Sequence, residues 1–422
     1  MKKLTYLILF LNIPVITFAS DTLYTRNIIS WESELVVESN SLTLDFFKRF
    51  LYGGYINESQ KNNWVSNLSN NNNLFSEISN GLFYHNKLGN NSISFSVKDR
   101  NLFRVNFTDD LMKVFLFGNY NYQNETLDFS NTNISFDRFQ QIKLGYSRSR
   151  KIQENKLTLE TAFSYLNGNQ HFSFVSEKAS FYTAPFGSYN DLDYDIKAFA
   201  TDTSNFNLFS NNGNGIAFDF SVSYKVTNKE YTIYLKDLGY INWNHSDLSY
   251  VTDTSFIFNG FKIDDLFDFN DSIFKDQINN FIDDLKVNPK RSSLKSYIPA
   301  SFGFKLETEL KDNYFSKYET GFNVRWQPHQ DNMFISVEKI LQGFYQSGYS
   351  PYFYIKTFAE NKYALIMPEL SFGGYYQKLS VGISVKFGKK VPISIGSNHF
   401  ENLFKGSDSK SLNIYLQIGK RF

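Results

Sequence analysis

The last eleven residues of the chain alternate between two kinds of side chain. Positions 412 to 422 place apolar residues on one face, namely Leu412, Ile414, Leu416, Ile418 and Phe422, and Asn413, Tyr415, Gln417 and Arg421 on the other. Because successive side chains of a strand point to opposite faces, this period of two predicts a strand that separates two different media. Its apolar face requires lipid or a second sheet to cover it.

The same alternation recurs through most of the chain. It is clearest where Ile216, Phe218, Phe220, Val222, Tyr224 and Val226 alternate with smaller or polar residues, and it returns at 318–326 and 379–387. A helix with this order would scatter its apolar groups around its whole surface. More than a dozen such segments predict an all-β fold, and an even number from about 14 to 18 antiparallel strands is compatible with closure into a barrel.

A soluble β-sandwich is the alternative that the alternation leaves open, with polar outer faces and apolar inner faces. The polar faces here mix Gly, Ser and Asn with charges of both signs, such as Lys143, Asp219 and Glu319, which is typical of a hydrated or ion-paired lumen. Bacterial barrels also have short periplasmic turns and longer outer loops. If the carboxyl terminus is periplasmic, counting strands back from it predicts short inner turns at 227–228, 327–331 and 388–390. It predicts long outer loops at 201–214, 341–350 and 396–411. The turn at 311–313 would then be an unusually tight outer turn. This spacing favours an antiparallel transmembrane β-barrel.

Composition agrees with strands that have one apolar and one wet face. Aromatic residues make up 18% of the chain although its mean hydropathy is negative at −0.36. The 43 basic and 42 acidic residues give a net charge of +1, which offers no basic field to attract nucleic acid. The aromatic residues, including Trp243 and Trp326, are predicted to form belts at the two membrane interfaces.

The amino terminus has the features of a secretory signal. Lys2 and Lys3 precede an apolar stretch, and Thr17-Phe18-Ala19 provides a cleavage site. The stretch contains Asn12 and Pro14 and is shorter than the roughly 20 residues of a spanning helix. With no cysteine in the chain, a lipid-modified cysteine and disulfides are excluded. We therefore expect a signal peptide at 1–19, an N-terminal periplasmic lead-in or plug segment at 20–73, a barrel at 74–422, and location in the cell outer membrane.

One insertion, at about 258–299, interrupts the alternation. Within it, 271–288 carries apolar residues at helical spacing, with a capping residue at Asp271 or Ser272 and Pro289 after its end. It is predicted to be a short amphipathic helix that packs on the end of the barrel or inside its mouth. The alternative is a helix that docks a protein partner or gates the barrel. Strand parity places it on the periplasmic side.

Several short blocks carry a family resemblance. They lie at 50–56, 97–100, 138–141, 236–243 and 258–261, are rich in glycine and aromatic residues, and resemble those of an uncharacterised Bacteroidetes-type outer-membrane family. That family is similar in layout to the long-chain fatty-acid transporter barrels and to the shuttle barrels of type IX secretion. The resemblance implies about 14 strands and an amino-terminal segment near the lumen. The chain has no clear match to the plug signature of the fatty-acid transporters.

The closing strand, Leu412 to Phe422, resembles the targeting signal at the end of bacterial outer-membrane barrels. This resemblance implies that the barrel assembly machinery recognises the strand during insertion, with outer-membrane lipid as the lasting partner.

Residues with catalytic or ligand-binding potential are sparse. The five histidines, His85, His171, His245, His329 and His399, have neither metalloprotease spacing nor a nearby G-x-S-x-G elbow. The acids Asp264, Asp265, Asp268 and Asp271 lack the glycine and closing glutamate of an EF-hand, and Gly53-Gly54 and Gly373-Gly374 are not followed by a phosphate-binding Lys-Ser/Thr. We therefore predict no catalytic residue, cofactor site or metal site, and no enzymatic activity.

Two functions follow from this architecture. The first is passage of a small or hydrophobic molecule across the outer membrane, which requires space or an apolar path inside the barrel. The alternative is a non-transporting scaffold or accessory barrel of a secretion or surface complex, with the 271–288 helix as its contact. An enzyme would instead bring Ser, His and carboxylate side chains together at the outer rim.

Overall fold

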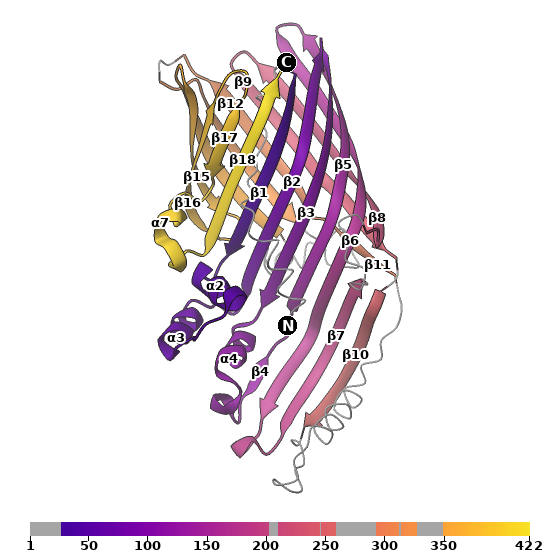
Figure 1. Cartoon of the computed structure of the whole chain (residues 1–422), viewed down its shortest axis with the longest axis vertical. Helices are drawn as coiled ribbons and strands as arrows, with labels where there is room; N and C mark the ends of the chain where they lie inside the picture. Colours follow the sequence, from indigo (N-terminus) through magenta and orange to yellow (C-terminus); the bar gives the residue numbers. More distant parts are fainter. Residues whose placement is uncertain (1–26, 202–209, 245, 259–292, 312–313, 327–348) are drawn as a thin grey trace.

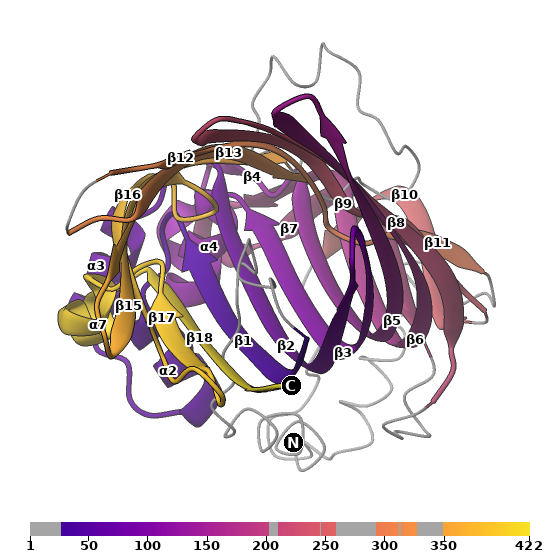
Figure 2. The same ribbon diagram turned by 90° about the horizontal axis from the view of Figure 1, so that it is seen from above.

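The computed structural model describes residues 27–201, 210–244, 246–258, 293–311, 314–326 and 349–422. Fourteen antiparallel strands pair edge to edge in a closed ring, as Figures 1 and 2 show, and the first strand pairs with the last from Ile28 opposite Arg421 to Glu38 opposite Ser411. The predicted antiparallel barrel, and the count of 14 preferred among 14 to 18, are confirmed. In ring order the strands are β1 (Ile28–Ser39), β2 (Asn72–Leu88), β3 (Asn91–Phe107), β5 (Thr132–Ile152), β6 (Asn155–Thr183), β8 (Gly213–Val226), β9 (Lys229–Trp243), β12 (Ala300–Glu309), β13 (Lys317–Trp326), β14 (Tyr349–Glu360), β15 (Ala364–Gly373), β16 (Lys378–Phe387), β17 (Ile393–Ser397) and β18 (Ser411–Arg421).

The two ends of the ring differ in how the strands are connected. Short turns such as 89–90, 153–154 and 227–228 lie at the same end as the carboxyl terminus, which we call the turn end. The opposite end, the loop end, carries the longer connections, among them 40–71, 108–131 and 398–410. This is the distribution that the connection lengths predicted for a barrel.

The described residues next to two predicted turns lie at the end opposite to the predicted one. The Glu309 amide donates to the Asn228 carbonyl at 2.7 Å, which places the end of β12, before the predicted turn 311–313, at the turn end. Residues 327–331 lie outside the described residues, but their neighbour Trp326 ends β13 at the loop end. The count ran back from the carboxyl terminus and needed a strand between 327–331 and 341–350, whereas Trp326 at the end of β13 pairs with Tyr349 at the start of β14, at one end of the ring. It also treated β10 (Ser246–Phe258) as a barrel strand, whereas β10 pairs with β7 outside the ring.

The strand β6 is shared between the ring and a set of strands outside it. Its residues 156–168 pair with β8 in the ring, and 172–183 pair with β7 (Asn190–Thr201), which pairs in turn with β10. The short β4 (Thr126–Asp128) joins β6 near its far end. We call β4, β7, β10 and the second part of β6 the extension; it projects beyond the loop end (Figure 1). A Cβ atom at Gly168, where the two parts of β6 meet, would lie 2.6 Å from the Trp243 ring, so this position requires glycine.

Three helices at the loop end form a second small core. They are α2 (Leu44–Tyr52), α3 (Glu58–Ser66) and α4 (Asp109–Phe117), and the side chains of Thr43, Asn57 and Thr108 cap their amino ends. We call these helices the collar. Shorter elements at the same end are α7 (Asn402–Lys405) and the 3₁₀ turns η2 (Tyr120–Tyr122), η3 (Pro185–Gly187) and η4 (Gly406–Asp408). Among the described helices, none combines the length and apolarity needed to cross a membrane.

The expected lead-in at 20–73 contains a barrel strand, because β1 pairs on both sides, with β18 and β2. Its alternation is weak in the sequence, since Ser33 interrupts the outward row of Ile29, Trp31, Leu35 and Val37. The residues described after β1 in this segment include α2 and α3. The predicted signal peptide, 1–19, lies outside the described residues.

The predicted helix at 271–288 also lies outside the described residues. The described residues on either side of its insertion, the end of β10 and Ala300 at the start of β12, lie at or beyond the loop end, whereas the parity count expected the other end. The last part of the predicted insertion forms β11 (Leu294–Tyr297), which pairs with the final residues of β9.

The two faces of the ring differ in chemistry. The outward face exposes large apolar side chains on nearly every strand, including Phe95, Leu144, Phe163, Phe218, Ile233, Phe304, Phe353, Phe372, Leu379 and Ile395. In β18, Asn413, Tyr415 and Gln417 are buried on the lumen side and the predicted row from Leu412 to Ile418 faces outward. Trp243 is buried in the lumen, so the prediction that it belongs to an interfacial belt is wrong. Trp326 lies on the outward face of β13 with Phe322 and Val324 and is 8% exposed.

Candidate functional site

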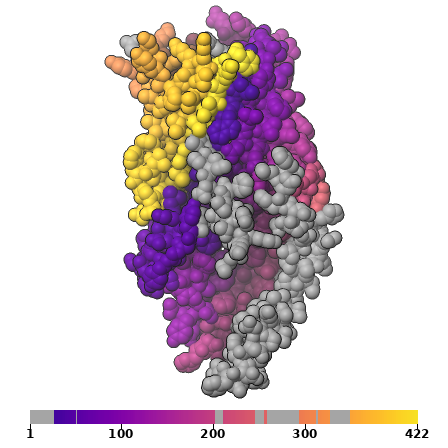
Figure 3. All heavy atoms as spheres, in the orientation of Figure 1, coloured from indigo at the N-terminus to yellow at the C-terminus, as the bar shows by residue number. Residues whose placement is uncertain are grey.

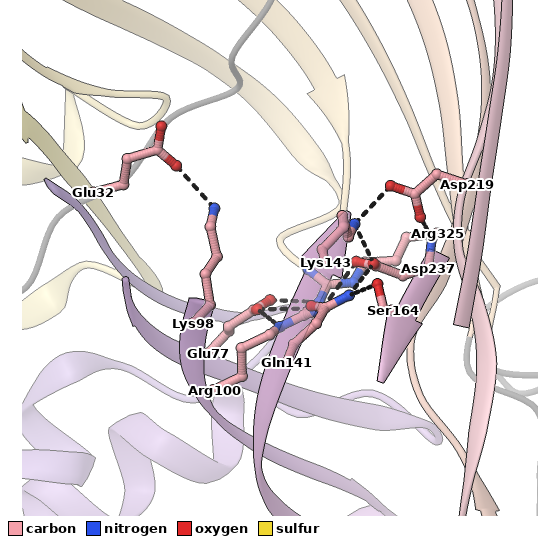
Figure 4. Close-up of polar contacts among 10 residues, drawn as sticks. All are labelled: Glu32, Glu77, Lys98, Arg100, Gln141, Lys143, Ser164, Asp219, Asp237 and Arg325. Atoms are coloured by element: carbon pink, nitrogen blue, oxygen red, sulfur yellow. Dashed lines mark hydrogen bonds and ion pairs between the residues drawn. The ribbon is translucent and has the colours of Figure 1, made fainter. Parts of the chain in front are cut away.

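The lumen is crossed by a contact between opposite walls. Glu77 on β2 accepts hydrogen bonds from Arg100 Nε at 3.0 Å and Nη2 at 2.8 Å, and from Nη2 of Arg325 at 2.5 Å. Arg100 lies on the adjacent strand β3, whereas Arg325 lies on β13, seven places from β2 in the ring of fourteen. The Glu77–Arg325 ion pair therefore joins the two sides of the barrel (Figure 4).

A second carboxylate extends this network along one wall. Asp237 accepts from Arg100 Nη1 at 2.9 Å, from Lys143 Nζ at 2.8 Å and from Gln141 Nε2 at 2.8 Å. Lys143 also contacts Asp219 at 2.6 Å (Figure 4). Each charged side chain named in this network has an oppositely charged partner within hydrogen-bonding distance, which offsets the free-energy cost of burying its charge.

A bulge in β9 orients Asp237. Lys236 and Asp237 together stand opposite Asp219 alone, and Asp237 has a φ of 54°. The Asp237 backbone amide donates to Asp219 Oδ1 at 2.8 Å, which stabilises this conformation. Bulges turn a side chain away from its regular direction, and this one directs the Asp237 carboxylate toward the cations of β3 and β5.

Apolar side chains fill the lumen next to the network, on its loop-end side. We call this cluster the lumen core, and it comprises Val36, Phe75, Leu102, Phe139, Leu166, Phe199, Ala217, Ile241, Trp243, Ile298 and Tyr375. The Phe75 and Tyr375 rings stack with centroids 4.6 Å apart, and the Arg325 guanidinium carbon lies 4.4 Å from the centre of the Phe75 ring. This part of the barrel is packed rather than open.

The other side of the lumen holds a cavity of about 320 Å³. It lies between β1, β2, β9 and β12 to β18, and its wall combines charged and hydroxyl groups with apolar surface. Its charged and tyrosine lining residues are Glu34, Glu38, Glu319, Glu369, Lys236, Arg325, Lys356, Lys386, Tyr234, Tyr352, Tyr354, Tyr375 and Tyr415. Lys356 contacts Glu369 at 2.7 Å and the Tyr352 hydroxyl donates to the same carboxylate at 2.5 Å. The volume suits a small molecule, and the charged and hydroxyl groups could bind polar groups on it.

The β15–β16 turn bounds this cavity near the loop end. Gly373 and Gly374 both have positive φ, 109° and 66°, which glycine adopts without strain. The turn brings the Tyr375 amide to Glu38 Oε2 at 3.0 Å, and Glu38 Oε1 lies 3.1 Å from Nε2 of the buried His399. The double glycine thus shapes the end of the cavity.

The structure brings an aspartate, a histidine and a serine together, which the sequence analysis did not foresee. His171 Nδ1 lies 2.7 Å from Asp137 Oδ1, and Nε2 lies 3.2 Å from Ser173 Oγ. This order resembles a nucleophilic triad. However, the imidazole stacks on Trp243 at 5.1 Å, and all three polar residues are at most 4% exposed, so a substrate cannot reach the serine in this conformation. The arrangement is a satisfied buried network.

The remaining candidate residues do not converge. His85 lies on β2 and His399 near Glu38, while His245, His329 and the acids 264–271 lie outside the described residues. No group of three or more potential ligands that could hold a metal ion occurs in the part of the chain that the structure describes. The only sequence signal for the Asp137–His171 contact was the spacing of His171 and Ser173 on one strand face.

Comparison with known proteins identifies a family without an assigned activity. Residues 27–403 match the model of the Family of unknown function (DUF5723). The match is to an uncharacterised family, as the resemblance predicted. No curated protein matches the chain.

Solved barrels are similar at low identity. The toluene transporter TodX of P. putida has 7% identity and a TM-score of 0.43, covering 94% of this chain and 90% of that one. A Pseudomonas aeruginosa FadL homologue has 8% identity and a TM-score of 0.43, covering 94% and 88%. The translocator domain of the autotransporter NalP from Neisseria meningitidis has 7% identity and a TM-score of 0.35, covering 100% and 94%. These similarities assign no substrate.

Proposed function

The chain belongs to the Family of unknown function (DUF5723), whose membership assigns no activity, and we propose that it is an outer-membrane barrel through which a small polar solute passes. In this proposal the Glu77–Arg325 pair closes the path between solute entry and exit. The amino-terminal segment 1–19 is proposed to direct export, and the outward row of β18, with Phe422, to direct insertion by the barrel assembly machinery.

The outward face supports the membrane location. Side chains such as Phe95, Phe218 and Phe353 are 43%, 53% and 51% exposed, and similar residues continue around the ring. A water-soluble monomer rarely exposes a continuous apolar surface of this kind. Acyl chains would cover it, and the closed ring leaves no strand edge unpaired in the hydrocarbon.

The observation that carries the passage function is the cavity, lined by many charged and tyrosine side chains, that ends at the cross-lumen ion pair. The cavity of about 320 Å³ would admit a small molecule, and its acids, lysines and tyrosines favour a polar solute over a hydrophobic one. Arg325 lines the cavity and also pairs with Glu77 on the far wall. Separation of this pair would join the cavity to the packed side of the lumen.

Channel recording tests the proposal. In planar lipid bilayers we expect rare openings of the unchanged protein and more frequent openings of Glu77→Gln, because the amide binds Arg325 less strongly than the carboxylate does. Glu177→Gln is the matched control, since Glu177 pairs with Lys197 on the exposed extension, outside the lumen. Equal opening frequencies of all three proteins would contradict passage through this path.

The extension favours the second candidate, a scaffold. Residues 172–183 of β6 with β7 and β10 form a sheet beyond the ring that solute passage does not require. A scaffold predicts that the protein co-purifies with a specific partner after mild detergent extraction. Loss of that partner on deletion of the β6–β7 hairpin, with conductance unchanged, would favour this function.

A further inference from the structure

The collar is attached to the outside of the barrel. Along β3, Phe95, Val97 and Phe103 are exposed on the outward face, while Arg100, Leu102 and Arg104 are buried on the lumen side. Val105 and Phe107 continue the outward row, and both pack in the collar core with Phe46 and Trp64. The helices therefore lie against the outward face, directly below the apolar band.

The collar exposes aromatic rings on its surface. Phe50 and Phe115, from α2 and α4, are 63% and 60% exposed, and their ring centroids are 6.4 Å apart. Tyr52 at the end of α2 and Tyr55 in the following turn are 64% and 84% exposed. The Phe50 ring stacks on buried Phe46 at 6.1 Å, so the exposed rings stand on an ordered core.

The surface continues around the loop end. The Leu44 amide at the start of α2 donates to the Ser409 carbonyl at 2.7 Å, next to η4 and α7. Leu403 and Phe404 of α7 are 43% and 78% exposed. In the space-filling view the indigo collar lies beneath the yellow carboxyl-terminal strands as one continuous side of the molecule (Figure 3).

We propose that the collar is a membrane-surface anchor, with Phe50, Tyr52, Tyr55 and Phe115 inserted at the boundary between lipid headgroups and acyl chains. Continuity with the apolar outward face of β3 selects lipid as the occupant, because a layer that covers Phe103 extends directly onto the collar. Tyrosine favours this boundary since its ring is apolar and its hydroxyl remains wet. The anchor rests on the proposed membrane location of the barrel.

The chain has no cysteine, so single substitutions can carry a nitroxide label for accessibility measurements in phospholipid nanodiscs. Labels at Phe50→Cys and Tyr55→Cys are compared with Phe95→Cys, on the outward face of β3, and with Lys178→Cys, whose side chain is 62% exposed on the extension. We expect the labels at Phe50→Cys and Tyr55→Cys to collide more with oxygen than with a water-soluble nickel chelate. The label at Phe95→Cys should show the same preference for oxygen, and the label at Lys178→Cys the opposite preference for the chelate. Each substituted residue is exposed, so folding should be retained.

The four labels test two proposals separately, the collar as a membrane anchor and the membrane location of the barrel. A label at Phe95→Cys that is as aqueous as that at Lys178→Cys would overturn the membrane location itself. A lipid-exposed Phe95→Cys with aqueous labels at Phe50→Cys and Tyr55→Cys would overturn the anchor alone. Labels on the collar that are shielded from both reagents would indicate a protein partner on this surface and also overturn the anchor.

Discussion

Replacement of Glu77 by glutamine removes the carboxylate that Arg325 contacts across the lumen, and its effect on stability can be worked from the structure. Two unit charges about 4 Å apart interact by roughly 4 kcal/mol at an effective dielectric constant of about 20. The Glu77 side chain is 4% exposed and that of Arg325 is 24% exposed, so water screens this pair only in part. Removing one partner of a buried pair typically costs about 3–5 kcal/mol, because the other charge loses its compensation. We expect Glu77→Gln to lower the free energy of unfolding by about this amount.

A double-mutant cycle isolates the contact between the walls. Arg325→Met leaves Glu77 paired with Arg100, so it should cost less than Glu77→Gln, about 1–2 kcal/mol. Combining the two changes should reveal a coupling of about 2–3 kcal/mol, within the range for residues of one network.

The assay is urea unfolding in lipid vesicles, followed by the gel mobility of the folded barrel. The corresponding cycle for the exposed pair Glu177–Lys197 is the control and should give at most about 1 kcal/mol. If the Glu77–Arg325 coupling is no larger than that of the control, the argument for a strong contact across the lumen is refuted.

Further changes test the rest of the lumen. Asp237→Asn removes the charge that pairs with two cations and should lower the free energy of unfolding by about 3 kcal/mol or more in the same assay; an unchanged midpoint would contradict the network. Trp243→Phe loses the 2.7 Å hydrogen bond to Ser296 Oγ and should cost about 1–3 kcal/mol, measured by thermal gel shift; a smaller loss would mean that this bond contributes little. Ser173→Ala should cost only about 1 kcal/mol and leave ester hydrolysis at background, whereas hydrolysis by the unchanged protein alone would restore the catalytic interpretation. Deletion of Phe422 should reduce the folded fraction in outer-membrane preparations, and equal amounts with and without it would argue against a targeting role for the last strand.

Strand faces were predictable because each strand carries its own evidence. In β18 and β8 the period of two identifies the outward and lumen sides without any distant contact, and the closed ring follows from many such segments. In β1 the polar lumen face and the outward Ser33 weaken the same signal, so the strand is recognisable only through its pairing with β2 and β18.

The sequence predicted where strands occur better than it predicted which of these strands belong to the ring. The alternating segment at 246–258 is a strand, but its partner is β7 and not a member of the ring. Nothing local distinguishes a strand that crosses a barrel from one that extends beyond it, and one misassigned strand reverses the inside and outside of every connection that the count reaches after it. The errors at 311–313 and 327–331 arose from the strand that the count needed between 327–331 and 341–350, although Trp326 and Tyr349 pair at one end of the ring.

The sequence predicted which kinds of side chain line the lumen, but not which of these side chains pair with one another. Lys143, Asp219 and Glu319 were expected on a wet or ion-paired face, as the structure has them. Which charges meet depends on ring geometry, since Glu77 and Arg325 are 248 residues apart in sequence and come from opposite walls. The Asp237 carboxylate depends on a bulge that has no clear sequence signal.

The double membership of β6 makes the extension a rigid arm. At about 3.3 Å per residue, its residues 177–183, which follow the last pairing of β6 with the ring strand β5 at Ser176, reach roughly 23 Å beyond the barrel wall. A load on the tip near Phe186 would therefore act as torque on the strand that also lines the barrel. Shortening the arm by two residues would keep the same side chains on each surface, whereas shortening it by one would exchange the surfaces.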